Sequence, residues 1–179
     1  MLLKILNDEH RILRIYEHLN DGGIVQLKMA RRANPDILFI IPNDAQEGVT
    51  INTHFLPWRA DTGYYIDLPT QNVGVTLFLT AELTGCCVGV QRIPDGSIRV
   101  CHYNSQGEDF DRSDFERYNN GGNVRHWLIP ERYGLFDNTV YYGGYHGGAD
   151  PTCFWGEFDG VNWKFYYQTP DKVIHNFAY

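Results

Sequence analysis

The amino-acid sequence predicts a single α+β domain over residues 1–179, in which antiparallel β-sheet predominates. Most apolar runs are short and bounded by turn residues, as buried strands are. Aromatic residues make up 15% of the chain and glycine occurs 18 times, a composition typical of β structure with many turns. Near the N-terminus, one segment carries apolar residues at helical spacing. No repeat or linker divides the chain, which is long enough for one hydrophobic core.

The first third of the chain is expected to contain one helix and three strands. Asn7 or Asp8 can cap the helix, and its apolar positions recur at three- and four-residue spacing at Ile12, Ile15, Tyr16 and Leu19. Strands are expected over residues 24–30, 37–41 and 49–56, the last ended by Pro57. Residues 58–69 have a mixed composition and are expected to form a surface loop.

The remainder predicts further strands joined by tight turns. Two of these turns are Pro94-Asp95-Gly96 and Asp159-Gly160, and each lies between strand-like runs. A short helix is expected at residues 113–116, within an acidic and polar stretch. The expected strands cover residues 75–79, 88–93, 98–103, 140–142, 153–155 and 163–167.

Charge and hydropathy exclude two classes of function. A formal net charge of −7 argues against nucleic-acid binding, which favours a basic surface. No segment approaches about eighteen consecutive apolar residues, so no membrane span is predicted. The apolar run at residues 1–6 is too short for a signal peptide. We expect a soluble monomer. The aromatic side chains of Trp58, Tyr64 and Tyr65 are candidates for contact with a protein partner.

The four cysteines do not follow a disulfide or zinc-binding pattern. Cys86 and Cys87 are adjacent, and Cys101 and Cys153 stand alone, without a CxxC motif or a histidine at ligand spacing. We therefore interpret all four as reduced thiols. Neither a metal nor an organic cofactor is expected.

The stretch Leu83-Thr84-Gly85-Cys86-Cys87 closes an apolar run and is followed by a predicted hairpin that returns to His102. A cysteine attacks as a thiolate, and a nearby imidazole can take up its proton. Gly85 tolerates unusual backbone angles and leaves room for a substrate carbonyl near backbone N–H groups, an arrangement that can form an oxyanion hole. We expect Thr84 and Gly85 to border that carbonyl.

The register of the hairpin decides which cysteine can serve His102. With a three-residue turn, His102 lies opposite Val88, and Cys86 is its diagonal neighbour on the same face. With a two-residue turn, His102 lies opposite Gly89, and Cys87 takes the diagonal position. Since side chains alternate between faces, only one of the two cysteines can face His102. The spacing alone leaves both registers open.

Residues 78–86, which read Phe-Leu-Thr-Ala-Glu-Leu-Thr-Gly-Cys, resemble the Leu-Ser-Gly-Cys motif of the bacterial toxin glutamine deamidases. That superfamily includes the catalytic domain of cytotoxic necrotizing factor, the proteins similar to Burkholderia lethal factor 1 and, more distantly, the chemotaxis-receptor deamidases. The lethal-factor branch also has a Leu-Pro-Trp sequence upstream, here Leu56-Pro57-Trp58. The resemblance covers residues 56–102, and Thr84 stands where the family usually has serine.

The resemblance implies a β-sandwich flanked by helices and a protein-glutamine deamidase that acts on a host protein. It implies Cys86 as the nucleophile and His102 as the base. It also implies Thr80 as the third catalytic residue, whose backbone carbonyl orients the imidazole. Targets within the family include Rho-type GTPases and a translation-initiation helicase, so a GTPase or a translation factor is the implied partner class, met in the host-cell cytoplasm.

Other functions remain open at this point. The same cysteine and histidine can serve a transglutaminase or another thiol amidase or peptidase, and an aromatic-rich β-sandwich can be a binding module without catalysis. His146 lies in a glycine-rich stretch at residues 143–148. We interpret it as an exposed turn residue rather than a lining of the substrate cleft.

Overall fold

The computed structural model of the protein describes residues 1–9, 11–15, 22–31, 36–58, 63–103, 126–130, 139–142 and 151–179. Within these residues the chain forms one helix and thirteen strands. They are α1 (Leu2–Glu9), β1 (Ile12–Ile15), β2 (Gly23–Arg31), β3 (Ile37–Pro42), β4 (Val49–Leu56), β5 (Gly63–Leu68), β6 (Leu77–Thr80), β7 (Cys87–Arg92), β8 (Ile98–Tyr103), β9 (His126–Pro130), β10 (Thr139–Tyr142), β11 (Cys153–Phe158), β12 (Trp163–Gln168) and β13 (Ile174–Phe177).

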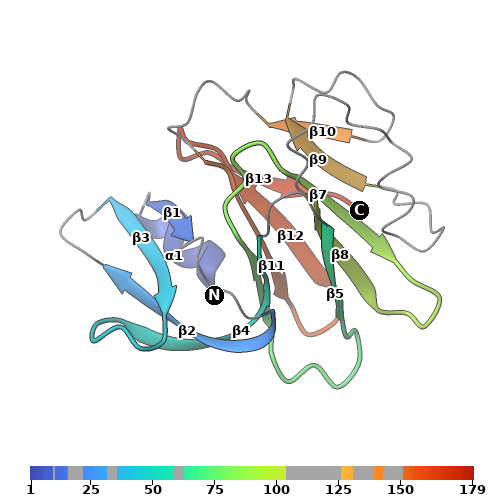
Figure 1. The fold of residues 1–179 in the computed structure, drawn as a ribbon, viewed down its shortest axis with the longest axis horizontal. Coiled ribbons are helices and arrows are strands. Elements are labelled where there is room, and N and C mark those ends of the chain that lie inside the picture. Colours follow the sequence, from blue (N-terminus) through green and yellow to red (C-terminus); the bar gives the residue numbers. More distant parts are fainter. Residues whose placement is uncertain are drawn as a thin grey trace.

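The described strands form two sheets (Figure 1). The larger sheet has eight strands in the order β1-β3-β2-β4-β6-β11-β12-β13, and the smaller has five in the order β10-β9-β7-β8-β5. Most neighbouring strands are antiparallel, but β1 with β3, β4 with β6, and β9 with β10 are parallel. The predicted β-rich fold, in which antiparallel pairing predominates, is therefore confirmed.

The central strands of the larger sheet are buried on both faces. On β6, Phe78 points into one apolar cluster while Leu77 and Leu79 point into another. On β11 the same alternation sends Phe154 to the first cluster and Trp155 to the second. Because side chains of a strand point to opposite faces in turn, these strands separate two hydrophobic cores.

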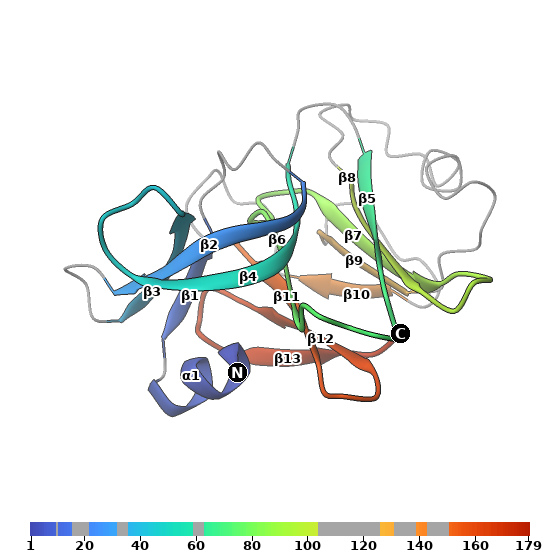
Figure 2. The same cartoon turned by 90° about the horizontal axis from the view of Figure 1, so that it is seen from below.

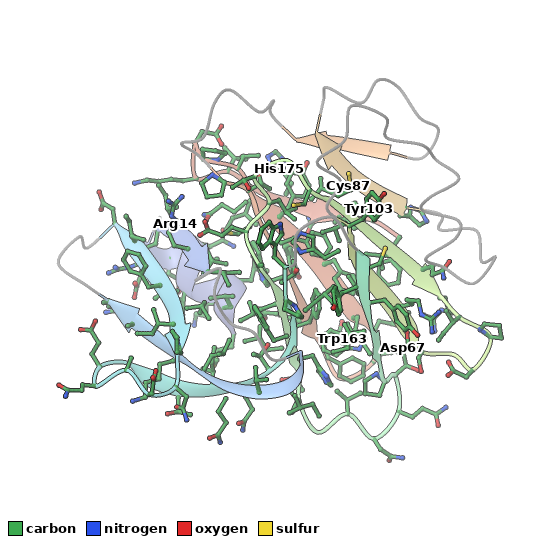
Figure 3. All side chains as sticks on the ribbon, viewed as in Figure 1. Arg14, Asp67, Cys87, Tyr103, Trp163 and His175 are labelled. Atoms are coloured by element: carbon green, nitrogen blue, oxygen red, sulfur yellow. The ribbon has the colours of Figure 1, made fainter. Side chains whose placement is uncertain are left out.

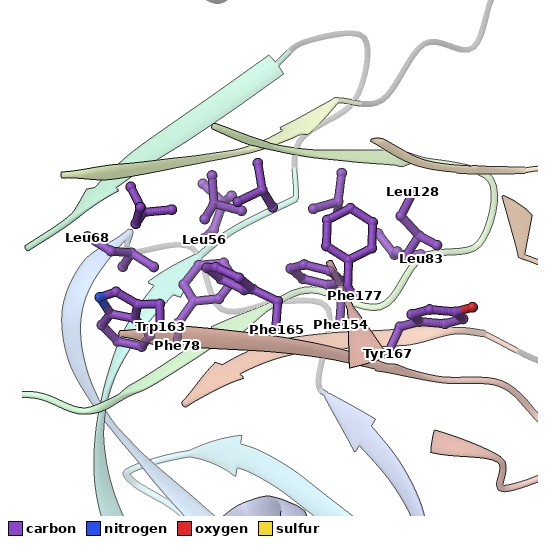
Figure 4. Close-up of a cluster of buried hydrophobic side chains, with 14 of the residues drawn as sticks. Leu56, Leu68, Phe78, Leu83, Leu128, Phe154, Trp163, Phe165, Tyr167 and Phe177 are labelled. Atoms are coloured by element: carbon purple, nitrogen blue, oxygen red, sulfur yellow. The ribbon is translucent and has the colours of Figure 1, made fainter. Parts of the chain in front are cut away.

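The first core, which we call the inner layer, lies between the two sheets (Figure 4). Aromatic rings dominate it: Phe154 and Phe165 stack with centroids 5.6 Å apart, and Phe78 meets Phe165 edge-on at 6.1 Å. The smaller sheet contributes β-branched residues from β7 and β8. Its members include Leu56, Phe78, Leu83, Cys86, Val88, Val90, Val100, Phe154, Phe165 and Phe177.

The second core lies inside the curl of the larger sheet. Strands β1 to β4 bend away from the rest of that sheet and partly enclose α1 (Figure 2). Leu2 and Leu6, one helical turn apart, are 1% exposed and pack there with Trp155 and Phe55. The Glu157 carboxylate accepts a hydrogen bond from the Leu3 amide at 2.6 Å, which satisfies one N–H group of the first helical turn.

The expected first helix is wrong in position. The helix spans Leu2–Glu9, and Ile12–Ile15 forms β1 with an alternating burial of its side chains. The spacing of Ile12 and Ile15 suits a helix, but pairing of residues 12–15 with β3 overrides that local preference. α1 is the only helix within the described residues, so the flanking helices that the resemblance implied are supported only in this limited form.

The expected loop at residues 58–69 is also wrong in part, since β5 occupies Gly63–Leu68 and pairs with β8. Its mixed composition reflects a strand at the edge of a sheet, where outward residues such as Tyr65 are half-exposed. The other expected strands within the described residues are present, and β9 and β13 lie outside the expected strand ranges. The expected helix at 113–116 and His146 lie outside the described residues. No described helix has both the length and the hydropathy needed to cross a membrane.

Candidate active site

The site is built where β6 of the larger sheet faces β8 of the smaller one. Thr80, the last residue of β6, is fully buried, and His102 of β8 is 2% exposed. The Thr80 Oγ1 and the His102 Nδ1 lie 2.7 Å apart. This hydrogen bond crosses the inner layer and joins the two sheets.

The hydrogen bonds of Thr80 determine which nitrogen of His102 carries the proton. The Thr80 hydroxyl donates its one hydrogen to the Leu56 carbonyl oxygen at 2.9 Å. The same oxygen must then accept from His102, so Nδ1 carries the ring proton and Nε2 carries the lone pair. Nε2 is buried and has no hydrogen-bond partner. The imidazole is therefore held as a base with its basic nitrogen available.

The resemblance implied that the backbone carbonyl of Thr80 orients the imidazole. The structure instead places the Thr80 hydroxyl at hydrogen-bond distance from Nδ1. The backbone next to it is engaged elsewhere, since the Ala81 amide bonds the Leu56 carbonyl at 3.2 Å. The residue is the expected one, but the contacting atom is different.

Burial lowers the pKa of His102 to about 3. An imidazolium in this apolar layer would lack solvent, so the ring is neutral at pH 7. A proton can be held on Nε2 only when a negative charge forms beside it. His102 is thus suited to take a proton from a group that becomes an anion in the same step.

The β7–β8 hairpin has the three-residue register. Val88 pairs with His102 and Cys87 pairs with Tyr103. The turn is closed by a bond from the Ile93 amide to the Ser97 carbonyl oxygen at 3.0 Å. The first of the two predicted registers is therefore confirmed.

This register separates the two adjacent cysteines. Cys86 belongs to the inner layer with Val88, on the side to which His102 also points. Cys87 lies opposite Tyr103 and so faces the other side of the smaller sheet (Figure 3). Between the two rivals, the geometry favours Cys86 as the partner of His102.

Cys86 and His102 share the layer but are not hydrogen-bonded to each other, because Nε2 has no partner. Both side chains are 2% exposed. The described conformation is therefore closed, and a reaction of Cys86 with another protein requires the site to open. No disulfide joins any of the four cysteines.

The segment before Cys86 is fixed up to Leu83 and exposed after it. Leu83 and Thr152 exchange two backbone hydrogen bonds, at 2.8 and 3.1 Å. Thr84 is exposed and Gly85 is partly exposed, with a φ of +135° at Gly85 that side chains rarely tolerate. Thr84 and Gly85 thus form the one accessible part of this stretch, and their role at a substrate carbonyl stays a prediction.

Two buried polar residues escaped the sequence analysis. Glu82 is 8% exposed and Gln168 is 2% exposed, and both bind the backbone of β1. A charged residue between Ala81 and Leu83, in an otherwise apolar run, was the available signal for Glu82. No local pattern marks Gln168, because its partners are about 155 residues away in the chain.

Within the described residues, no group of three or more histidine, cysteine or acidic side chains is arranged to hold a metal ion. Of the three side chains proposed to grip a partner, Trp58 is 36% and Tyr65 49% exposed, whereas Tyr64 is half-buried and packs against the inner layer. Arg99 lies over the Tyr65 ring at 4.1 Å and makes a paired hydrogen bond with Asp67. Tyr65 is therefore held in place on the outer side of the smaller sheet.

Comparison with known proteins adds no relative. The chain matches no protein-family model, and no curated protein matches it significantly.

Proposed function

We propose that the protein is a cysteine-dependent protein-glutamine deamidase. One observation carries the proposal: the Thr80 hydroxyl holds His102 with its basic Nε2 available in the same buried layer as Cys86. A thiol and an oriented imidazole are what this chemistry requires. Neither a metal nor an organic cofactor takes part in the proposed reaction.

The reaction begins when the Cys86 thiol gives its proton to Nε2 of His102. The thiolate attacks the carbonyl carbon of a glutamine side chain, and the imidazolium then donates its proton to the leaving ammonia. A thioester remains on Cys86. His102 takes a proton from water, the resulting hydroxide displaces the thiolate, and the product is glutamate.

The neutral state of His102 suits this sequence of steps. Its lowered pKa means that the ring accepts a proton only as the thiolate forms, and that it returns this proton readily to the leaving nitrogen. Thr80 supports both proton transfers, because its bond to Nδ1 fixes the ring and leaves Nε2 for the reacting groups. The exposed Thr84 and Gly85 are the proposed place for the carbonyl oxygen of the glutamine.

The proposed substrate is a protein of a host cell, with a GTPase or a translation factor as the class that the resemblance suggests. The partly exposed Trp58 and Tyr65 are suited to contact such a partner, because large aromatic side chains bury much area at interfaces. We propose that the protein reaches the host cytoplasm by secretion or delivery and acts there as a toxin or effector.

Mass spectrometry of a host-cell lysate tests this function. The lysate is treated with wild type, Cys86→Ser or Cys87→Ser, and glutamine-to-glutamate conversions are compared with an untreated sample. We expect conversions with wild type and Cys87→Ser and none with Cys86→Ser. All three proteins should fold. Conversions that disappear with Cys87→Ser and persist with Cys86→Ser would show that the nucleophile is assigned wrongly.

The same experiment separates the related thiol chemistries. Addition of an amine to glutamine indicates a transglutaminase, and shortened peptides indicate a peptidase. The burial of Cys86 and His102 favours a further alternative, a binding module in which the two residues only pack. A thiol-reactive probe that labels Cys86 no faster than the other buried cysteines, in the presence of lysate, would support that alternative.

A further inference from the structure

Side chains from other parts of the chain form hydrogen bonds with the backbone at the outer edge of β1. β1 pairs with β3 on one side, and its other edge presents four backbone groups between residues 11 and 15. Gln168 binds two of them, accepting from the Leu13 amide at 2.7 Å and donating to the Arg11 carbonyl oxygen at 2.7 Å. The Cys153 thiol donates to the Leu13 carbonyl oxygen at 3.1 Å. Glu82 accepts from the Ile15 amide at 2.7 Å.

Among these side chains, Glu82 bears a charge. Its carboxylate is 8% exposed, and the Arg14 guanidinium lies 3.6 Å away. A buried carboxylate costs free energy unless hydrogen bonds and an opposite charge compensate it. The Ile15 amide and Arg14 supply both, so the position of Glu82 is tied to that of β1.

Glu82 also lies within the segment that carries the site. It follows Thr80 by two residues and precedes Cys86 by four. Its neighbours are anchored as well, Ala81 through the Leu56 carbonyl and Leu83 through Thr152. Glu82 therefore connects β1 to the backbone between Thr80, which binds His102, and Cys86, the proposed nucleophile.

We infer that Glu82 is a positioning residue for Cys86. Its carboxylate, fixed by the Ile15 amide and Arg14, holds residues 81–86 so that the thiol meets His102 when the site opens. The inference rests on the proposed function, because it takes the Cys86–His102 pair as the reacting groups. Gln168 anchors the same segment through two hydrogen bonds but lies on β12, outside the segment that leads to Cys86.

The experiment compares Glu82→Leu with Gln168→Leu. Each removes the acceptor of one buried β1 amide and keeps the side-chain volume. Gln168→Leu also removes the donor to the Arg11 carbonyl oxygen, so it is a demanding control for loss of stability, measured as the melting temperature. The measurement is the rate of iodoacetamide labelling of Cys86 from pH 6 to pH 9, followed by peptide mass spectrometry, with Cys87 as the internal reference. His102→Ala provides the profile of a thiol without its base.

At pH 6, where an unassisted thiol is protonated, we expect Cys86 of wild type to be labelled faster than Cys86 of His102→Ala, since the neutral imidazole takes the thiol proton as the thiolate reacts. Glu82→Leu should lower the labelling rate at pH 6 to that of His102→Ala and lower kcat for deamidation about 10- to 100-fold at similar KM, as misplacement of a reacting group does. Gln168→Leu should keep the wild-type labelling rate and kcat. Glu82→Gln, which retains an acceptor for the Ile15 amide, should restore most of the wild-type profile.

Equal labelling rates at pH 6 for Glu82→Leu and Gln168→Leu would overturn the positioning role and leave the proposed dyad intact. An unchanged labelling rate at pH 6 in His102→Ala would instead overturn the dyad, and the positioning role with it. Should Glu82→Leu fail to fold, Glu82→Ser and Gln168→Ser carry the same comparison, because a serine hydroxyl is too short to reach the β1 amides.

Discussion

The inner layer contains two buried histidines, and the contrast between them identifies the one suited to catalysis. His102 of β8 and His54 of β4 are 2% and 5% exposed, and Nε2 of each has no hydrogen-bond partner. Burial lowers the pKa of both rings. By these measures alone they are equivalent.

Their fixed partners differ. The ring of His102 is held by a side-chain hydroxyl from the opposite sheet, at the start of the segment that leads to Cys86. The ring of His54 meets Trp163 edge-on, with centroids 5.9 Å apart, and the nearby backbone of Val75 only partly offsets the lowering of its pKa by burial. An unpartnered buried nitrogen is therefore not by itself a sign of a catalytic base. The distinction comes from what orients the ring and from what lies within its reach.

The largest expected effect separates the two histidines by activity. His102→Gln should lower kcat for glutamine deamidation by about 10²- to 10⁴-fold, the usual contribution of a general base. His54→Gln should leave kcat near that of wild type, because nothing connects His54 to the thiol. Deamidation rates of the two variants, measured on folded protein, test the comparison. Equal losses in both variants would contradict it.

The next effect concerns the threonines beside each histidine. Thr80→Val removes the hydroxyl that binds Nδ1 of His102 and the Leu56 carbonyl, and should cost about 1–3 kcal/mol of unfolding free energy. It should also lower kcat about 10- to 100-fold, because the imidazole loses its orientation.

Thr53→Val is the matched control. The Thr53 hydroxyl is equally buried and lies 3.0 Å from the His54 carbonyl oxygen and 3.1 Å from that of Leu77. Its loss should cost similar stability, as measured by denaturant unfolding, without the loss in kcat. A drop in kcat of the same size would mean that Thr80 acts only through stability.

Lowering the pH should reduce the free energy of unfolding through both histidines. Because the pKa of each is lower in the folded than in the unfolded state, their contribution to stability is present above about pH 6.5 and decreases as the pH falls below that value. His102 alone should account for about 2 kcal/mol between pH 6.5 and pH 5, since its folded pKa is about 3. Urea unfolding at pH 7, 6 and 5 measures the slope.

His102→Gln should flatten that slope, and His54→Gln should flatten it further when the two are combined. Restricting the range to pH 5 and above keeps most carboxylates ionised and so isolates the histidines. An unchanged slope in His102→Gln would indicate that the ring is solvated in solution.

The smallest effect is expected at the ring next to His54. Trp163→Phe removes the hydrogen bond from Nε1 to the Pro69 carbonyl oxygen, 2.9 Å long, and keeps an aromatic ring beside His54. We expect a loss of about 1 kcal/mol of unfolding free energy. Thermal unfolding and the deamidation assay together check this variant, and a fall in kcat would show that the His54 end of the layer does influence the site.

Local patterns predicted the parts of the fold that local chemistry determines. The turn at Pro94-Asp95-Gly96 and the alternation of β7 and β8 were sufficient to limit the register to two possibilities, one of which the structure has. The hairpin at Asp159-Gly160 was predicted for the same reason, and Gly160 there has a φ of +101°. Short-range turn residues restrict the chain before any tertiary contact forms.

Features that depend on distant partners were missed. The apolar spacing of residues 12–19 suited a helix, whereas β1 forms because Gln168 and Glu82 satisfy its edge from distant parts of the sequence. The same limit applies to the site. The order of residues indicated His102 with either Cys86 or Cys87, and the resemblance implied Cys86 and Thr80. The atom by which Thr80 contacts the ring depends on how the two sheets face each other.

The recognition of β1 through its main chain has a consequence for how this segment can change during evolution. Gln168, Glu82 and Cys153 bind amide and carbonyl groups that every residue except proline provides. The identity of a residue at positions 11–15 therefore matters where its side chain enters the second core, as Leu13 and Ile15 do at 1% exposure, and at Arg14, whose guanidinium lies beside Glu82. Homologous chains can be expected to vary most at positions 11 and 12 while the three binding side chains stay fixed.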